Sequence, residues 1–207
     1  MPSYARDPIL KPVSIADLRP TQMSVGMREV KEKRKRLRER GIEKIGGFLG
    51  DHMIPVVLGP DKRYFVIDHH HLALALHLER IKKVLVTVVA DLSEVAPEDF
   101  WHVLDQFNWV YAYDERGRRC DFSEIPNSVD KLKDDPFRSL AGELRRRGGF
   151  AKDTAPFSEF LWADFFRRRV RRKAIVKDFD AALKKAMALA KGSDARYLPG
   201  WCGPTDS

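Results

Sequence analysis

The sequence of 207 residues predicts an α+β fold, with a small mixed sheet and its helices in residues 1–95 and a mostly helical extension in residues 96–207 that packs on them. Val84–Ala90 (VLVTVVA) is nearly continuous and β-branched, which predicts a strand buried on both faces. Tyr64–His77 (YFVIDHHHLALALH) passes from an apolar run through a polar turn to an alanine- and leucine-rich segment, which predicts strand, turn and helix. The second half instead shows apolar residues at helical spacing.

Two further strand patterns precede the three histidines. Pro12–Leu18 alternates between polar and apolar residues and predicts a first strand. Met53–Leu58 predicts a second strand, and Gly59–Asp61 is a strong turn signal. Tyr64–Ile67 is therefore expected to return as the second strand of a hairpin and to deliver Asp68 to one end of the sheet.

A basic segment lies between the first two strands. Arg28–Arg40 holds eight basic and three acidic residues, and its composition predicts a helix. Val30 and Leu37, seven residues apart, form its thin buried stripe. Most of its surface must then be solvated, so a surface helix is the first interpretation and a phosphate-facing helix is the alternative.

The second half is expected to be mainly helical. Its predicted elements are a helix from Pro97, a short hairpin over Trp109–Phe122, a helix from Asp135 to Gly148 and a helical region over Pro156–Ala190, broken near Ala174. Asp135 is predicted as an N-cap because Pro136 follows it at the first helical position. Trp201, in the tail, is expected to pack back onto the body.

Composition narrows the class of protein and its partners. A net charge of +8 favours a polyanionic partner, and Arg167–Lys173 concentrates six basic residues in seven. No run approaches the length of apolar sequence that spans a membrane, and Met1–Leu10 lacks the apolar core of a signal peptide. Cys120 and Cys202 are far apart and fit a reducing compartment. We therefore expect a cytoplasmic protein without a membrane partner.

The histidine-rich turn is the main candidate site. Asp68 is predicted to cap a helix whose first turn holds His69, His70 and His71. A helix N-terminus attracts anions, and histidines there can donate to an anion, transfer a proton or bind a metal. His70 is expected to be the best-placed of them, and its replacement by alanine is expected to leave the fold nearly intact. The alternative is that individual histidines only pack or face solvent.

A second candidate lies near residue 135. Asp134 and Asp135 precede a predicted helix whose first turn holds Arg138 and Ser139. Helix capping explains this arrangement well. The functional alternative is that Arg138 and Ser139 reach an anion, or that the two aspartates reach a metal ion.

The run Val66–Leu76 (VIDHHHLALAL) resembles the DGHHR-type box of the ParB/sulfiredoxin superfamily, in which a strand leads into a helix N-terminus that binds nucleotide or phosphate. The chain is similar to one branch in particular, the ParB-like nuclease family. That similarity also includes Leu18–Val30, Asp134–Phe150 and Pro156–Arg167, so it extends over most of the chain. The resemblance implies a ParB/sulfiredoxin-like sheet domain with a helical C-terminal extension.

The superfamily contains CTP-hydrolysing partition proteins, ATP-dependent sulfinic acid reductases, a nucleotide-dependent serine kinase and proteins described as nucleases, so the fold alone selects no activity. This sequence departs from the usual box, since His69 stands where many members have glycine and Leu72 where a phosphate-binding arginine is usual. Arg19, Arg28 or Arg138 would then have to supply that charge. The box contains no cysteine, which argues against reductase chemistry.

Two functional hypotheses result. The first is a nuclease, nucleotidase or nucleotide-dependent kinase acting on nucleic acid or a nucleotide, with Asp68 orienting the loop or helping to hold Mg²⁺ or Mn²⁺ and with His70 and His71 as base or phosphate donors. The phosphate-binding residues of this hypothesis are His69, Arg19, Arg28, Arg138 and Ser139. The second is a non-catalytic DNA-binding or regulatory module that uses the two basic segments. Both leave the oligomeric state open.

Overall fold

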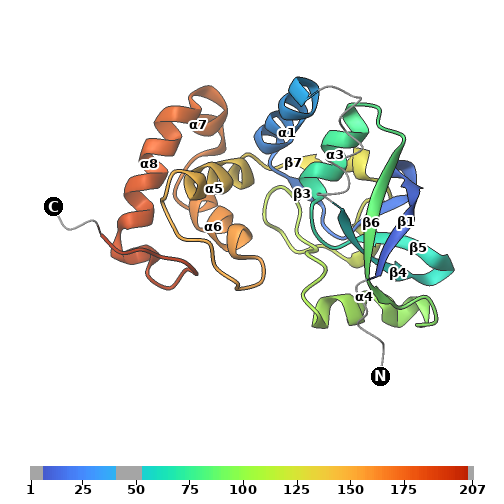
Figure 1. Cartoon of the computed structure of the whole chain (residues 1–207). Coiled ribbons are helices and arrows are strands. Elements are labelled where there is room, and N and C mark those ends of the chain that lie inside the picture. Colours follow the sequence, from blue (N-terminus) through green and yellow to red (C-terminus); the bar gives the residue numbers. More distant parts are fainter. Residues whose placement is uncertain (1–6, 41–52, 205–207) are drawn as a thin grey trace. The chain divides into compact units, whose positions relative to one another are not determined.

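The computed structural model describes residues 7–40 and 53–204, which fold into two compact units (Figure 1). Unit 1 comprises the residues up to Ser24, Val30–Asp114 and Arg118–Lys133, and unit 2 comprises Val25–Glu29, Glu115–Gly117 and the residues from Asp134 onward. The predicted boundary between residues 95 and 96 lies inside unit 1.

The elements confirm the α+β class. The strands are β1 (Asp7–Ser14), β2 (Leu18–Pro20), β3 (Ser24–Val25), β4 (Ile54–Gly59), β5 (Arg63–Val66), β6 (Lys83–Asp91) and β7 (Lys133–Asp134). The α-helices are α1 (Met27–Arg40), α3 (His70–Leu78), α4 (Pro97–Gln106), α5 (Pro136–Arg146), α6 (Ser158–Arg167), α7 (Arg172–Lys177) and α8 (Phe179–Lys191). Short 3₁₀ turns include η1 (Ile15–Asp17) and η5 (Val129–Lys131). None of the helices described here has both the length and the apolar character needed to cross a bilayer.

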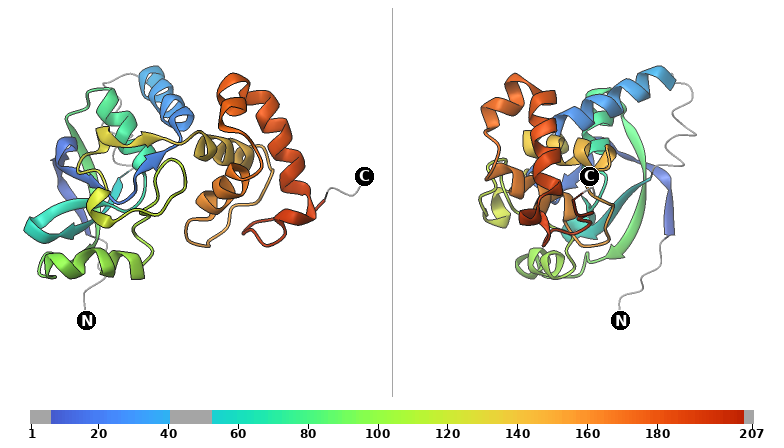
Figure 2. Two further views of the ribbon diagram at one scale, coloured as in Figure 1. Left: turned by 180° about the vertical axis from the view of Figure 1, so that it is seen from behind. Right: turned by 90° about the vertical axis from the view of Figure 1, so that its left-hand side faces the viewer.

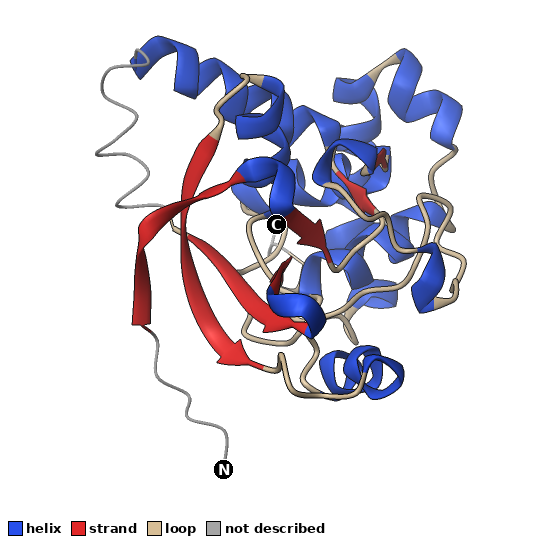
Figure 3. Ribbon diagram, turned by 90° about the vertical axis from the view of Figure 1, so that its right-hand side faces the viewer, coloured by secondary structure: helices blue, strands red, loops and turns tan. Residues whose placement is uncertain are grey.

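The main sheet belongs to unit 1 and has the strand order β1-β6-β4-β5-β2. The β1–β6 and β4–β5 pairs are antiparallel, and the β4–β6 and β2–β5 pairs are parallel. β1 and β2 are the two edges, although only the turn η1 separates them in sequence. Five flat strands would place their edges about 19 Å apart, whereas the chain from Ser14 to Leu18 spans at most about 14 Å. The sheet must therefore curl, as its strands do in Figure 3.

An apolar cluster joins this sheet to the segment that follows it. The rings of Phe65 in β5 and Phe100 in α4 have centroids 4.6 Å apart, and Leu104, one turn further along α4, is fully buried. Val110 and Ile125 belong to the same buried cluster. The chain as far as Ile125 thus shares the core of the sheet, which is why the boundary expected near residue 95 falls within unit 1.

Two strand predictions differ from the structure. The strand expected over Pro12–Leu18 is interrupted by η1, because β1 pairs at one edge of the sheet and β2 pairs with β5 at the other. β6 was expected to be buried on both faces, but Val84 and Val86 are buried while Leu85 and Thr87 are half-buried. The β-branched run therefore predicted the strand correctly, but the second face of β6 is less buried than expected.

Helices α5 to α8 form the body of unit 2, and α5 packs against the other three (Figure 2). The fully buried Trp162 of α6 stacks on Phe150 at a centroid distance of 4.4 Å, and its indole N–H donates to the carbonyl oxygen of Pro199 at 2.8 Å. Trp201 is half-buried and packs against this core, as predicted. The C-terminal segment is thus held against the helices.

The predicted start of α5 is confirmed, and the predicted break near Ala174 is wrong. Asp135 is the N-cap of α5, and its side chain accepts a hydrogen bond from the Phe137 amide at 3.0 Å. Ala174 lies inside α7, and the helical region is divided instead after Arg167 and at Asp178. Asp178 ends α7 and caps α8 by accepting from the Ala181 amide, so a second capping aspartate makes the break.

The basic helix α1 is tied to α3 by ion pairs within unit 1. Arg34 and Arg38 both donate to the carboxylate of Glu79, the C-cap of α3, at 2.6 and 2.8 Å. Val30 and Leu37 are buried, as predicted from their spacing. The hydrogen bonds from Arg38 and then Arg34 lower the pKa of Glu79 from 4.5 to about 2. Part of the positive charge of this segment therefore serves the fold.

Glu79→Gln should lower the free energy of unfolding of the protein by about 1 kcal/mol at neutral pH, since exposed Arg38 leaves the pair partly screened by solvent. The folded pKa is depressed, so the stabilisation is present above pH 4.5 and is lost as the pH falls toward about 2. Urea titrations of both proteins across this range measure it. A difference between the two proteins that stays constant down to the lower pH would contradict the role of Glu79.

Candidate functional site

The turn between β5 and α3 holds the predicted histidine site in unit 1. Asp68 and His69 are exposed, and α3 begins at His70. The N-cap is His69 rather than the predicted Asp68, and its backbone is left-handed with φ 64° and ψ 25°. Asp68 instead accepts a hydrogen bond from the His69 amide at 2.6 Å. His69 therefore takes the conformation that glycine adopts most easily. This agrees with the glycine that the DGHHR-type box usually has at this position.

His70 has a different environment from the one expected. Its side chain is buried, and its Nε2 accepts a hydrogen bond from the Thr21 amide at 3.1 Å. The Thr21 hydroxyl in turn donates to the Val66 carbonyl oxygen at 2.8 Å. Because Nε2 accepts, the proton of the neutral ring is on Nδ1. His70 joins the segment after β2 to the start of α3, and this contact removes the basis for expecting that His70→Ala leaves the fold nearly intact.

His71 and the first helical amides complete this turn. His71 is half-buried in the first turn of α3. The first intrahelical bond runs from the Ala73 amide to the His69 carbonyl oxygen at 2.9 Å, so the amides of His70, His71 and Leu72 precede it at the positive end of the helix dipole. The geometry brings one carboxylate, two imidazoles and a helix N-terminus together on a short stretch of chain.

Arg19, proposed to supply a phosphate-binding charge, lies in β2. This strand pairs with β5, and Arg19 is opposite Phe65 in the register. Its Nη1 donates to the Asn127 carbonyl oxygen at 2.6 Å, so part of the guanidinium holds the segment before η5. The Asn127 carbonyl oxygen carries no net charge, so this hydrogen bond does not balance the positive charge of Arg19.

Asp134 and Ser139, from the second candidate site, lie in unit 2 and accept hydrogen bonds from the first turn of α1. Asp134 accepts a hydrogen bond from the Met27 amide at 3.0 Å, and the Ser139 hydroxyl oxygen accepts one from the Arg28 amide at 3.2 Å. At Gly26, a Cβ would lie 2.7 Å from the backbone nitrogen of Ser139, so no larger residue fits without movement. Ser139 therefore caps α1, whereas the capping expected from the sequence concerned its own helix, α5.

Arg28 and Arg138 have aromatic neighbours in the same unit. The guanidinium of Arg28 lies 3.8 Å from the ring centroid of Phe179, and that of Arg138 lies 3.4 Å from the centroid of Phe160. Arg138 is buried. Cation–π contacts of this kind stabilise packing. These arginines, like Ser139, thus have structural contacts, and their predicted phosphate-binding role stays a prediction.

The composition of the site bears on the choice of metal. Within residues 7–40 and 53–204, no group of three or more His, Cys, Asp and Glu side chains is placed to hold a metal ion. Asp68 is the carboxylate at the turn, and one of its oxygens already accepts from His69. Mg²⁺ is often held by one or two carboxylates together with phosphate oxygens of the substrate. The single carboxylate of Asp68 fits a site of this kind, in which the substrate supplies the other oxygens.

Thr21 is a residue of this site that sequence reasoning did not single out. It lies in the segment Leu18–Val30, which carries part of the family resemblance, but neither its amide nor its hydroxyl has a recognisable sequence signal. The contact with His70 connects residues that are far apart in sequence. Only the parallel pairing of β2 with β5 brings them together.

His69→Gly should raise the free energy of unfolding by about 0.5 to 1 kcal/mol, because a left-handed conformation strains any residue with a Cβ. His71→Gly is the matched control, since the same change inside α3 should lower stability by about 1 kcal/mol. Thermal and urea unfolding of the two variants measures this. Similar losses in both variants would contradict strain at His69.

Comparison with known proteins places the chain in a family. The family described as "Putative ParB-like nuclease" matches residues 11–168. The chain is similar to the crystal structure of protein Atu1540 from Agrobacterium tumefaciens, with 50% sequence identity, a TM-score of 0.89, and coverage of 96% of this chain and 100% of that one. No curated protein matches the sequence. Because the family match extends over more than half of the chain and includes the β5–α3 turn, the chain belongs to the ParB-like nuclease family.

Proposed function

We propose that this protein hydrolyses a phosphate ester of a nucleotide or a nucleic acid at the turn between β5 and α3. The observation that carries the proposal is the position of Asp68, His69 and His71 at the N-terminal end of α3, with the first two exposed and the third half-buried. Helix N-termini bind phosphate through their amides and dipole. Membership of the ParB-like nuclease family supports the same class of substrate.

In the proposed reaction, the residues of the turn have separate tasks. The first amides of α3 and the His69 imidazole bind the phosphate oxygens. His71 accepts the proton of a water molecule as the water oxygen bonds to phosphorus, and the phosphorus–oxygen bond to the leaving group breaks. The protonated His71 then returns the proton to the leaving oxygen. His70 holds the turn through Thr21 and is a positioning residue.

A divalent cation, Mg²⁺ or Mn²⁺, fits this proposal through Asp68. The carboxylate of Asp68 would supply one ligand, and substrate phosphate oxygens and water would supply the others. Bound there, the cation would neutralise the charge of the phosphate. The hydrogen bond from the His69 amide fixes the orientation of that carboxylate.

A second candidate function is nucleic-acid binding without catalysis. The six basic residues among the seven of Arg167–Lys173 favour it. Both candidate functions include binding of a phosphate-bearing ligand. Only the first includes hydrolysis of that ligand, so turnover distinguishes them.

The experiment that tests the proposal is a thermal-shift panel of the four ribonucleoside triphosphates and a short DNA oligonucleotide, with and without Mg²⁺ or Mn²⁺, followed by an assay for released phosphate or cleaved oligonucleotide. A ligand at 100 times its dissociation constant should stabilise the protein by about 2.7 kcal/mol. Stabilisation with turnover supports the hydrolase. Stabilisation without turnover would support the second candidate, and no stabilisation by any ligand would contradict both.

A further inference from the structure

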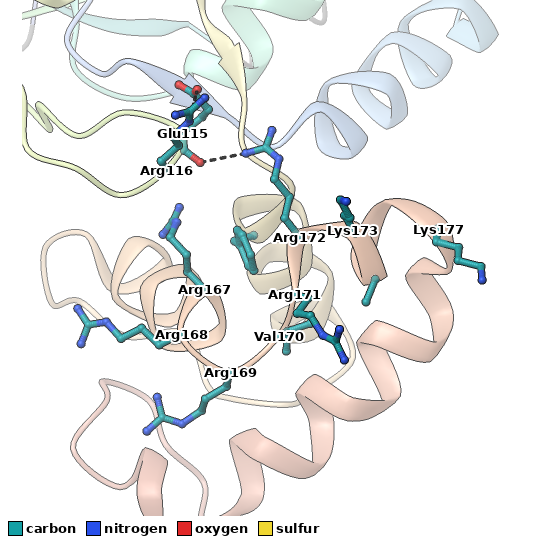
Figure 4. Close-up of a pocket in the computed structure, with 12 residues that line it drawn as sticks. Glu115, Arg116, Arg167, Arg168, Arg169, Val170, Arg171, Arg172, Lys173 and Lys177 are labelled. Atoms are coloured by element: carbon teal, nitrogen blue, oxygen red, sulfur yellow. Dashed lines mark hydrogen bonds and ion pairs between the residues drawn. The ribbon is translucent and has the colours of Figure 1, made fainter.

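Unit 2 contains a cavity of about 750 Å³ with a strongly basic lining (Figure 4). Eight of its twelve lining residues are arginine or lysine, and Glu115 is the one acidic residue among them. The lining residues come from Glu115 and Arg116, Phe137 of α5, the end of α6, the connection to α7 and α7 itself. Ligand sites in proteins usually measure about 300–1,000 Å³. The cavity therefore has the size of a binding site and the charge of an anion site.

Two of the arginines hold the walls of this cavity. Arg167 forms ion pairs with Asp135 and Asp164, so its charge is balanced inside unit 2. Arg172 donates to the carbonyl oxygens of Glu115 and Asp134, each at 3.3 Å, and Figure 4 shows the first of these bonds. Carbonyl oxygens carry no net charge. Arg172 therefore fixes the wall and still contributes its positive charge to the cavity.

Four more cations of the lining are exposed and lack a balancing carboxylate. Arg168, Arg171, Lys173 and Lys177 are all exposed, and none of them forms an ion pair within the part of the chain that the structure describes. Like charges that lie close together repel each other, which disfavours the folded state. A polyanion bound in the cavity would neutralise these charges, so its binding should stabilise unit 2.

We infer that this cavity binds the phosphodiester backbone of a nucleic acid. The inference rests on the proposed function and makes it more specific, since it names nucleic acid rather than a mononucleotide as the substrate class. Lys173 and Lys177 are one helical turn apart on α7, so the charge extends along a line and can meet successive phosphates. Arginine side chains suit phosphate because their planar groups donate two hydrogen bonds at once.

The lining predicts contact with the backbone rather than with bases. Phe137 is the one aromatic residue of the lining, and it is 4% exposed, so it offers no platform on which a base could stack. Phosphate contacts position a nucleic acid without reading its sequence. Binding at this cavity should therefore be independent of sequence and strongly dependent on salt.

Fluorescence anisotropy of labelled single-stranded and duplex DNA of two unrelated sequences, between low and moderate salt, tests the inference. The variant Arg171→Gln/Lys173→Gln removes two charges from the cavity. The control Lys184→Gln/Lys185→Gln removes two exposed charges from α8 in the same unit, outside the lining. The cavity variant should bind duplex roughly tenfold more weakly and reduce the slope of log affinity against log salt by about 2. The control should bind like the wild type.

Equal effects of the two double variants, or no salt-dependent binding by the wild type, would overturn the inference. Preference for one of the two sequences would overturn the backbone mode. The same titration with His71→Ala separates this inference from the proposed function, because loss of turnover at α3 should leave binding at the cavity unchanged. Binding of inorganic triphosphate that nucleic acid does not displace would assign the cavity to a small anion and contradict the inference.

Discussion

Asp135→Ala should lower the free energy of unfolding by about 3 kcal/mol, the largest stability effect expected in unit 2. The side chain is almost completely buried, caps α5 through the Phe137 amide and pairs with Arg167. Burial raises the pKa of the Asp135 carboxyl, against the opposing charge of Arg167. Its removal would leave Arg167 with only part of its balancing charge and the first turn of α5 without its acceptor. Urea unfolding at neutral pH measures the loss.

Asp164→Ala is the matched control for this prediction. Asp164 pairs with the same arginine, but its side chain is 26% exposed, and it lies within α6 rather than at a cap. Its loss should therefore be near 1 kcal/mol. Equal losses for the two variants would contradict the importance of burial and capping at Asp135. A small loss of stability in Asp135→Ala would contradict that importance as well, whatever the loss in Asp164→Ala.

His71→Ala should lower the rate of hydrolysis of a generic phosphodiester, bis(para-nitrophenyl) phosphate, at least about 100-fold, because general base catalysis typically contributes that much. Its stability should change little, since the side chain is half-buried in the first turn of α3. The assay is steady-state kinetics with Mn²⁺, accompanied by thermal unfolding of the same preparation. Full activity in a folded His71→Ala protein would exclude His71 as the base.

His70→Ala, unlike His71→Ala, should clearly lower the free energy of unfolding. Truncation removes a buried ring and leaves the buried Thr21 amide without its acceptor, at a cost of about 2 kcal/mol. His70→Gln is the control, because its side-chain oxygen can accept the same hydrogen bond and should recover part of the loss. If the alanine variant were as stable as the wild type, His70 would have no positioning role.

Local patterns predicted the elements well. The β-branched run Val84–Ala90 lies within β6, and the Asp135-Pro136 pair starts α5. In both cases neighbouring residues determine the outcome, through strand propensity or a cap. The division of the last helical region was predicted near Ala174 and was misplaced, because Asp178 caps α8 and ends α7 without a proline or glycine beside it.

Long-range contacts were the part that the sequence did not predict. The N-cap at His69 instead of Asp68 depends on a left-handed residue that no propensity favours. The burial of His70 depends on Thr21, which the sheet pairing brings to it. The capping of α1 by Asp134 and Ser139 likewise joins distant segments. Several candidate residues therefore contact segments other than those that the sequence led us to expect.

Amide NMR of ¹⁵N-labelled protein, titrated with each ribonucleoside triphosphate in the presence of Mg²⁺, tests the central claim that phosphate binds at the N-terminus of α3. Phosphate oxygens accept hydrogen bonds from helix N-terminal amides, so the largest shift changes should fall on His69, His70, His71 and Leu72. Asp68→Asn should reduce the Mg²⁺ dependence of these changes. Shift changes confined to Arg167–Lys177, with the amides of His69 to Leu72 unaffected, would contradict the claim.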